Sequence, residues 1–102
     1  MKFTILVADD ERNIREGLAE ALRLDGYDVA LAADGEEALR TVQEGRIDLI
    51  VTDLRMPKLS GNEILKRVAG AYPGLPVIVL TGHGTIEDAV DSMRGGAFDF
   101  IT

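Results

Sequence analysis

The sequence predicts an α/β fold, a doubly wound parallel sheet of five strands with helices on both faces. Five short runs rich in apolar and β-branched residues alternate with four stretches whose apolar residues recur at helical spacing. The five runs are continuously apolar, which is typical of strands buried on both faces. A strand-helix-strand rhythm implies right-handed crossovers, and the strands are therefore expected to be parallel.

The elements can be placed along the chain. The expected strands are Phe3–Ala8, Asp28–Ala32, Leu49–Thr52, Val77–Leu80 and Phe98–Ile101. The apolar positions of the intervening helices are Ile14, Leu18, Ala21 and Leu22; Ala38, Leu39 and Val42; Ile64, Leu65 and Val68; and Ile86, Ala89, Val90 and Met93. Each set predicts one apolar stripe on an otherwise polar helix.

Local signals mark where these helices begin and end. Ser60 with Glu63, and Thr85 with Asp88, have the spacing of a capping box at a helix N-terminus. The glycines expected to end helices are Gly26, Gly45 and the pair Gly95-Gly96.

Length and composition limit the kind of protein. At 102 residues with 46% hydrophobic content, residues 1–102 are expected to form one domain with one core. No apolar run approaches the roughly 18–20 residues of a membrane span, and no signal peptide precedes the first strand. The chain has no cysteine, which excludes disulfide and thiolate chemistry and fits a reducing compartment. We therefore expect a cytoplasmic location.

The net charge of −7 disfavours direct binding to nucleic acid or to an anionic membrane. The excess of acidic residues has two interpretations. It can serve solubility alone, or several acids can converge on a cation.

The end of the chain departs from the rhythm. Thr102 follows the fifth strand directly, where the pattern predicts one more helix to cover that part of the sheet. We interpret the chain as an excised or truncated domain that lacks its last helix, and we expect apolar surface to be left bare.

The strand ends are the place to look for a site, because ligands of open parallel sheets bind outside the carboxyl ends of the strands. Asp9 and Asp10 follow the first strand, Asp53 follows the third and Thr81 follows the fourth. Carboxylates that meet at one edge repel one another unless a cation lies among them, and Mg²⁺ suits an open site with few protein ligands. The alternative for Asp-Asp-Glu is simple capping of the next helix, worth about 0.3–1 kcal/mol.

In these segments the chain resembles the receiver domain of the response regulators of bacterial two-component signalling. The resemblance rests on Asp9-Asp10, on Asp53-Leu54-Arg55-Met56-Pro57 with Gly61 following, on Thr81-Gly82, and on Gly96-Ala97-Phe98-Asp99-Phe100. The segments from Thr81 to Thr85 and from Gly96 to Phe100 look most like receivers of transcription activators that use an ATPase domain and the alternative sigma factor. The resemblance implies a flavodoxin-like sheet with strand order 2-1-3-4-5.

The resemblance also implies roles. Asp53 would accept a phosphoryl group from a sensor histidine kinase and become an aspartyl phosphate. Asp10, Asp53 and the Arg55 backbone carbonyl would ligate Mg²⁺, with Asp9 acting through water. Thr81 and Phe100 would be the switch residues, although Phe100 also suits an ordinary core position. The domain would act on its own output domain, controlling transcription, and would catalyse only its own phosphorylation and dephosphorylation.

One feature of receivers is missing. They normally carry a lysine just after the fifth strand that reaches the phosphoryl group, and here the chain ends at that point. Lys58, in the loop after Pro57, and Lys66, within a helix, are poor substitutes. We expect weaker coupling between phosphorylation and the switch. The uncovered face also predicts a homodimer or a domain-exchanged oligomer.

Three other functions compete with this one. A haloacid-dehalogenase-like phosphatase needs an Asp-x-Asp nucleophile after the first strand, and a flavodoxin-like or dinucleotide-binding module needs a glycine-rich turn there. A pseudo-receiver, which binds a partner without phosphoryl chemistry, remains open because the lysine is missing. His83, flanked by glycines, is expected to be exposed rather than a metal ligand or phosphorelay residue.

Overall fold

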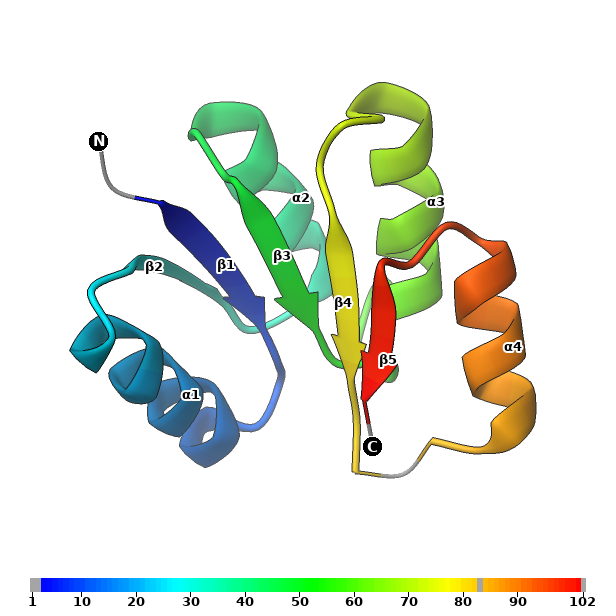
Figure 1. Cartoon of the computed structure of the whole chain (residues 1–102), viewed down its shortest axis with the longest axis horizontal. Helices are drawn as coiled ribbons and strands as arrows, with labels where there is room; N and C mark the ends of the chain where they lie inside the picture. Colours follow the sequence, from blue (N-terminus) through cyan, green and yellow to red (C-terminus); the bar gives the residue numbers. More distant parts are fainter. Residues whose placement is uncertain (1–2, 83, 102) are drawn as a thin grey trace.

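The computed structural model describes residues 3–82 and 84–101, which form five strands and four helices in alternation (Figure 1). The strands are β1 (Thr4–Ala8), β2 (Asp28–Ala32), β3 (Leu49–Thr52), β4 (Val77–Leu80) and β5 (Asp99–Ile101). The helices are α1 (Arg12–Leu24), α2 (Gly35–Glu44), α3 (Gly61–Ala71) and α4 (Ile86–Arg94). The sequence therefore predicted every element, with Phe3 and Phe98 falling just outside their strands.

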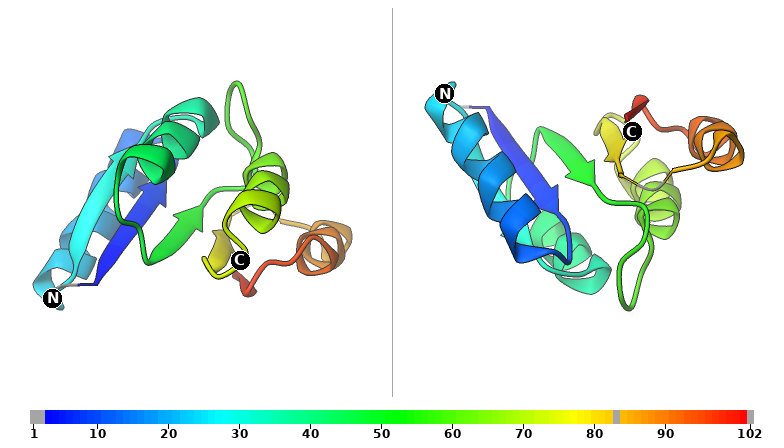
Figure 2. Two further views of the ribbon diagram at one scale, coloured as in Figure 1. Left: turned by 90° about the horizontal axis from the view of Figure 1, so that it is seen from above. Right: turned by 90° about the horizontal axis from the view of Figure 1, so that it is seen from below.

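The five strands form one parallel sheet in the order β2-β1-β3-β4-β5, which confirms the predicted doubly wound fold. The chain moves outward from β1 to β2 and then crosses back to β3. Helix α1 lies on one face of the sheet, α2 and α3 lie on the other, and α4 lies beside α3 at the β5 edge (Figures 1 and 2). The direction of winding reverses between β1 and β3, so their carboxyl ends are where a ligand site is expected.

The core lies between the sheet and the helices α2 and α3. Leu6 of β1, Ile50 of β3, Val79 of β4 and Ile64 of α3 are completely buried in it. Burying a side chain of this size stabilises the fold by about 1.5–3 kcal/mol. The central strands are therefore held firmly, and the loops at their ends start from fixed positions.

Both predicted capping boxes are present. Ser60 caps α3 with Glu63, and Thr85 caps α4 with Asp88, each pair exchanging the two reciprocal hydrogen bonds. Gly26 and Gly96 follow the ends of α1 and α4 with φ of 96° and 104°, the left-handed conformation that favours glycine.

The apolar stripes are not all buried. Ile14 on α1 and Val90 and Met93 on α4 are 47%, 43% and 48% exposed. The apolar stripes of α1 and α4 are present, but these three of their residues are not buried.

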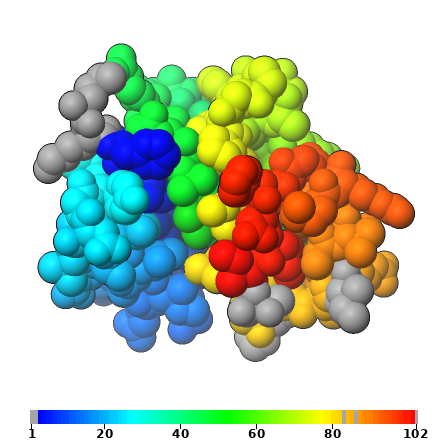
Figure 3. Space-filling view, in the orientation of Figure 1, coloured from blue at the N-terminus to red at the C-terminus, as the bar shows by residue number. Residues whose placement is uncertain are grey.

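One face of the sheet is partly uncovered. Atoms of β3 and β4 are visible between α1 and β5 (Figure 3), Leu80 is half-buried, and Ile101 is exposed. No helix among the described residues is long and apolar enough to span a membrane.

Candidate functional site

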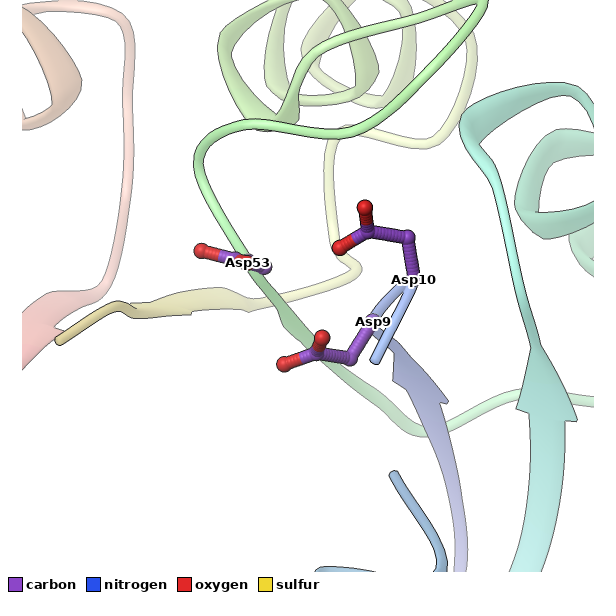
Figure 4. Close-up of side chains that lie close together, drawn as sticks. All are labelled: Asp9, Asp10 and Asp53. Atoms are coloured by element: carbon purple, nitrogen blue, oxygen red, sulfur yellow. The ribbon is translucent and has the colours of Figure 1, made fainter. Parts of the chain in front are cut away.

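Three carboxylates meet at the carboxyl edge of the sheet. Asp9 and Asp10 follow β1, and Asp53 follows β3 (Figure 4). Ala8 and Thr52 are paired in register, so the residues after them emerge side by side. One carboxylate oxygen from each of the three residues lies within 4.8 Å of the others. The juxtaposition predicted from the strand ends is therefore present, with oxygen ligands of the kind that Mg²⁺ prefers.

Asp9 is the buried member of the cluster, with 7% of its surface exposed. Its Oδ1 accepts a hydrogen bond from the Glu11 N–H at 2.9 Å. Burial raises the pKa of the Asp9 carboxyl, and the charges of Asp53, Asp10 and Glu11 raise it further, against the opposing effect of the Glu11 N–H. The fold therefore stabilises the Asp9 carboxylate less than water does, and a cation in the cluster would offset this cost.

Simple helix capping does not account for the acidic run. Glu11 occupies the N-cap position of α1, yet its side chain makes no capping hydrogen bond. The Asp9 backbone carbonyl is instead held by Arg15 of α1, whose Nη1 donates to it at 2.9 Å. Helix α1 therefore fixes the backbone beneath the acidic cluster.

Asp53 is half-buried, and hydrogen bonds hold both its backbone and its side chain. Its N–H donates to the Ala8 carbonyl at 2.9 Å, and its Oδ1 accepts from the Leu54 N–H at 2.7 Å. Helix α3 starts close above it, because a Cβ on Gly61 would lie 2.4 Å from the Asp53 carbonyl oxygen. Only glycine fits at that position, which gives a physical reason for the Gly61 of the sequence motif.

A pocket of about 220 Å³ opens beside the carboxylates. Its lining consists of Asp9, Glu11, Ile14, Asp53, Leu80, Thr81 and Gly82. Liquid water occupies about 30 Å³ per molecule, so the pocket can hold a hydrated cation together with a small anion such as a phosphoryl group. Asp10 is exposed and lies outside this lining, although its carboxylate belongs to the acidic cluster.

The two expected switch residues lie close to each other. Thr81 is buried, and its N–H donates to the Ile101 carbonyl at 3.0 Å. Phe100 is half-buried and packs against the core. Gly84 lies between them, since a Cβ there would come within 2.6 Å of the Phe100 ring and 2.9 Å of the Thr81 methyl carbon. A shift of Thr81 would thus change the packing of Gly84 in the loop and of Phe100.

Two ion pairs that the sequence analysis missed join the loop after Asp53 to neighbouring helices. Arg55 Nη2 lies 3.3 Å from Asp88 Oδ2 in α4, and Lys58 Nζ lies 3.7 Å from Asp34 Oδ2 before α2. Asp34 is the N-cap of α2, and its Oδ1 accepts from the Glu37 N–H at 2.8 Å. The spacing of Asp34 and Glu37 was an available signal for that cap.

Lys58 pairs with Asp34, and Lys66 is exposed on α3. His83 lies outside the described residues. The Arg55 carbonyl as a metal ligand stays a prediction.

The comparisons with known proteins decide the family. The response regulator receiver domain matches residues 5–102 of the chain. The chain belongs to the response regulator receiver family. Receiver domains are signalling switches rather than turnover enzymes, and they bind Mg²⁺. This assignment decides against the phosphatase and the dinucleotide-binding module.

Relatives cover nearly the whole of this receiver. It is 40% identical over 101 residues to the response regulator MprA of Mycobacterium tuberculosis, spanning 99% of this chain and 44% of MprA. It is 38% identical over 98 residues to the transcriptional regulatory protein GlrR of Escherichia coli, spanning 96% of this chain and 22% of GlrR. The chain thus spans less than half the length of these relatives.

A solved structure bears on the site. The response regulator TrrA of Thermotoga maritima, in complex with Mg²⁺ and beryllofluoride, is 36% identical and superposes with a TM-score of 0.89. The match covers all of this chain and 86% of TrrA.

Proposed function

We propose that this receiver is a phosphorylation-operated switch in which Asp53 accepts a phosphoryl group from a sensor histidine kinase. The observation that carries the proposal is the convergence of three carboxylates beside a pocket that Thr81 also lines. Asp53 is the member of the cluster that is half-buried, lines the pocket and follows a central strand. It is therefore presented to a donor while its backbone is fixed.

In the transfer, one bond to phosphorus forms as another breaks. An Asp53 carboxylate oxygen forms a bond to phosphorus as the phosphorus–nitrogen bond of a phosphohistidine breaks. The histidine nitrogen keeps the electron pair and takes a proton, and Asp53 becomes an acyl phosphate. Release of the phosphoryl group to water restores the carboxylate.

The residues that would hold Mg²⁺ are Asp10, Asp53 and the Arg55 carbonyl, with Asp9 acting through water. Bound there, the ion would neutralise charge that develops on the transferred phosphoryl oxygens. The donor set fits a hard cation, because all of its members offer oxygen. The raised pKa of Asp9 means that its negative charge is poorly stabilised in the metal-free site, which favours the binding of a cation there.

Thr81 and Phe100 would carry the signal onward. Phosphorylation adds about −1.5 to −2 charge and strong acceptor oxygens at Asp53, toward which the Thr81 hydroxyl can donate. A Cβ at Gly84 would clash with both Thr81 and Phe100, so the two side chains approach the same point and a movement of Thr81 would leave space that the ring can enter.

The partners follow from the family. We infer a cytoplasmic protein whose receiver acts on an output domain that controls transcription, as the relative named a transcriptional regulatory protein suggests. The partly uncovered face with Leu80 and Ile101 also suits a homodimer or a domain-exchanged oligomer. Sedimentation that shows a compact monomer over a wide concentration range would refute that assembly.

The test of the main proposal is direct. Incubation with acetyl phosphate and Mg²⁺ should add one phosphoryl group, seen by intact mass and mapped to Asp53, and Asp53→Asn should abolish it. A pseudo-receiver would show no adduct and no Mg²⁺-dependent binding of beryllofluoride.

A further inference from the structure

The Asp88 carboxylate serves two partners with one oxygen. Its Oδ2 accepts a hydrogen bond from the Thr85 N–H at 3.1 Å, which is half of the capping box of α4. The same Oδ2 lies 3.3 Å from Arg55 Nη2. The oxygen that caps α4 therefore also holds the arginine of the Asp53 loop.

This ion pair joins two loops that follow the carboxyl ends of neighbouring strands. Arg55 follows Asp53 by two residues, while Asp88 lies in the first turn of α4, after the loop that begins at Thr81. The two partners are 33 residues apart in the sequence. The pair thus joins the loop of the phosphoacceptor to the loop of the expected switch residue.

The contact between Arg55 and Asp88 is weak enough for Arg55 to change partners. The Arg55 side chain is 68% exposed, and its contact with Asp88 is a single hydrogen bond of 3.3 Å, longer than the roughly 2.7–2.9 Å of a strong charge-assisted bond. Exposed pairs of this kind change an equilibrium constant by a factor of about 1.4 to 5. A phosphoryl group offers more, because its charge exceeds that of a carboxylate and a guanidinium can donate two parallel hydrogen bonds to it.

We propose that the Arg55 guanidinium exchanges ion-pair partners. It pairs with Asp88 when Asp53 is unmodified and with the phosphoryl group when Asp53 is phosphorylated. This inference rests on the proposed function of Asp53. Phosphorylation then removes the Arg55 contact from the first turn of α4 and leaves Asp88 its contacts with Thr85. Arg55, two residues after Asp53, thereby supplies a cationic contact to the phosphoryl group.

Competition for one guanidinium has a thermodynamic signature. Removing Arg55 should weaken the binding of a phosphoryl analogue, because the analogue loses its cation. Removing the charge of Asp88 should strengthen it, because Arg55 no longer has to leave a partner. Asp88→Asn is the suitable variant, since its amide oxygen can still accept the Thr85 N–H.

The experiment is a double-mutant cycle on the whole chain, with beryllofluoride as the probe at saturating Mg²⁺ and affinity measured by titration calorimetry. We expect Arg55→Gln to weaken binding about tenfold and Asp88→Asn to tighten it about threefold. In the Arg55→Gln background, Asp88→Asn should change nothing. Lys58→Gln, which removes a cation from the same loop, is the matched control and should alter affinity less than twofold.

Amide hydrogen exchange over residues 85–89 gives an independent signal. Beryllofluoride should speed exchange in the wild type, and Arg55→Gln should show the faster exchange without the probe.

The outcomes separate this inference from the proposed function. Equal tightening by Asp88→Asn in both backgrounds would mean a general charge effect and would overturn the exchange of partners, as would wild-type affinity in Arg55→Gln. In both cases the wild type still binds beryllofluoride, so the proposed function stands. Absence of Mg²⁺-dependent binding in the wild type would overturn both.

Discussion

The loop from Asp53 to Ser60 is attached to α2 on one side and to α4 on the other, and the two attachments differ in kind. On the α2 side, Leu59 is buried against Gly35, and the Lys58–Asp34 ion pair is added to that packing. On the α4 side, the ion pair between Arg55 and Asp88 is exposed. A packed apolar contact resists small displacements, whereas an exposed ion pair can exchange partners with water or with another anion.

This difference predicts which flank of the loop responds when Asp53 is phosphorylated. A charge that appears at Asp53 perturbs both flanks, but the α2 flank is held by packing that leaves no space for a methyl group at Gly35. The α4 flank has an electrostatic contact that the new charge can compete for. The response is therefore expected to pass toward α4 rather than toward α2, and the two flanks can be tested separately.

The largest effect on stability is expected from the α2 flank. Leu59→Ala removes a buried side chain that packs on the first residue of α2 and should lower the free energy of unfolding by about 2–3 kcal/mol. The comparison variant, Arg55→Ala, should lower it by less than about 1 kcal/mol. Urea denaturation followed by circular dichroism measures both, and equal losses would contradict the difference between the flanks.

Gly35 offers a second way to break the same flank. A Cβ there would lie 2.3 Å from the Leu59 Cβ and 2.4 Å from its carbonyl oxygen, so Gly35→Ala must displace the loop. We expect a loss of about 1–3 kcal/mol in the free energy of unfolding.

Gly70 provides the matched control for that substitution. It is exposed within α3, and a Cβ at this position would meet no atom within 4 Å. Gly70→Ala should therefore be neutral or stabilise the protein by up to about 1 kcal/mol. A similar loss in both variants would show that the packing of Leu59 on Gly35 is unimportant.

The sequence predicted the helices of both flanks but neither of the ion pairs that join them to the Asp53 loop, for a physical reason. Strands, helices and capping boxes depend on residues within a few positions of each other, so Ser60 with Glu63 could be identified directly. Asp34 with Glu37 carries the same kind of signal and could have been found. The contact of Arg55 with Asp88 depends on how two distant loops are placed, and no local pattern contains it.

The acidic cluster was predictable for a related reason. Parallel strands bring their carboxyl ends to one edge, so Asp9, Asp10 and Asp53 could be expected to meet once the strands were identified. The exposure of Ile14 could not be predicted, because an apolar stripe does not reveal which of its residues border a pocket, as Ile14 does.

The acidic cluster between the flanks supplies a smaller effect on stability, whose sign follows from Asp9. Its raised pKa means that the folded state holds the Asp9 proton more tightly than the unfolded state. Its contribution to stability is therefore complete below the unfolded value of 3.8 and is lost as pH rises through the higher folded pKa.

Without metal, Asp9→Asn should accordingly be more stable than the wild type at pH 7, and the difference should vanish below the unfolded pKa. Mg²⁺ should narrow the difference by stabilising the wild type more than the variant. Thermal unfolding at several pH values, with and without Mg²⁺, measures this. A variant that is less stable than the wild type at pH 7 would contradict the burial of an uncompensated charge.

The smallest effect concerns the two cations themselves. Lys58→Gln and Arg55→Gln each remove one partner of an exposed ion pair, so each should change the free energy of unfolding by only about 0.2–1 kcal/mol, and 1 M NaCl should abolish most of the change. The two variants should be about equally stable, yet only Arg55→Gln should clearly alter the affinity for beryllofluoride. If both variants lost affinity equally, the loop would be acting as a general positive surface, and the α4 flank would have no privileged connection to Asp53.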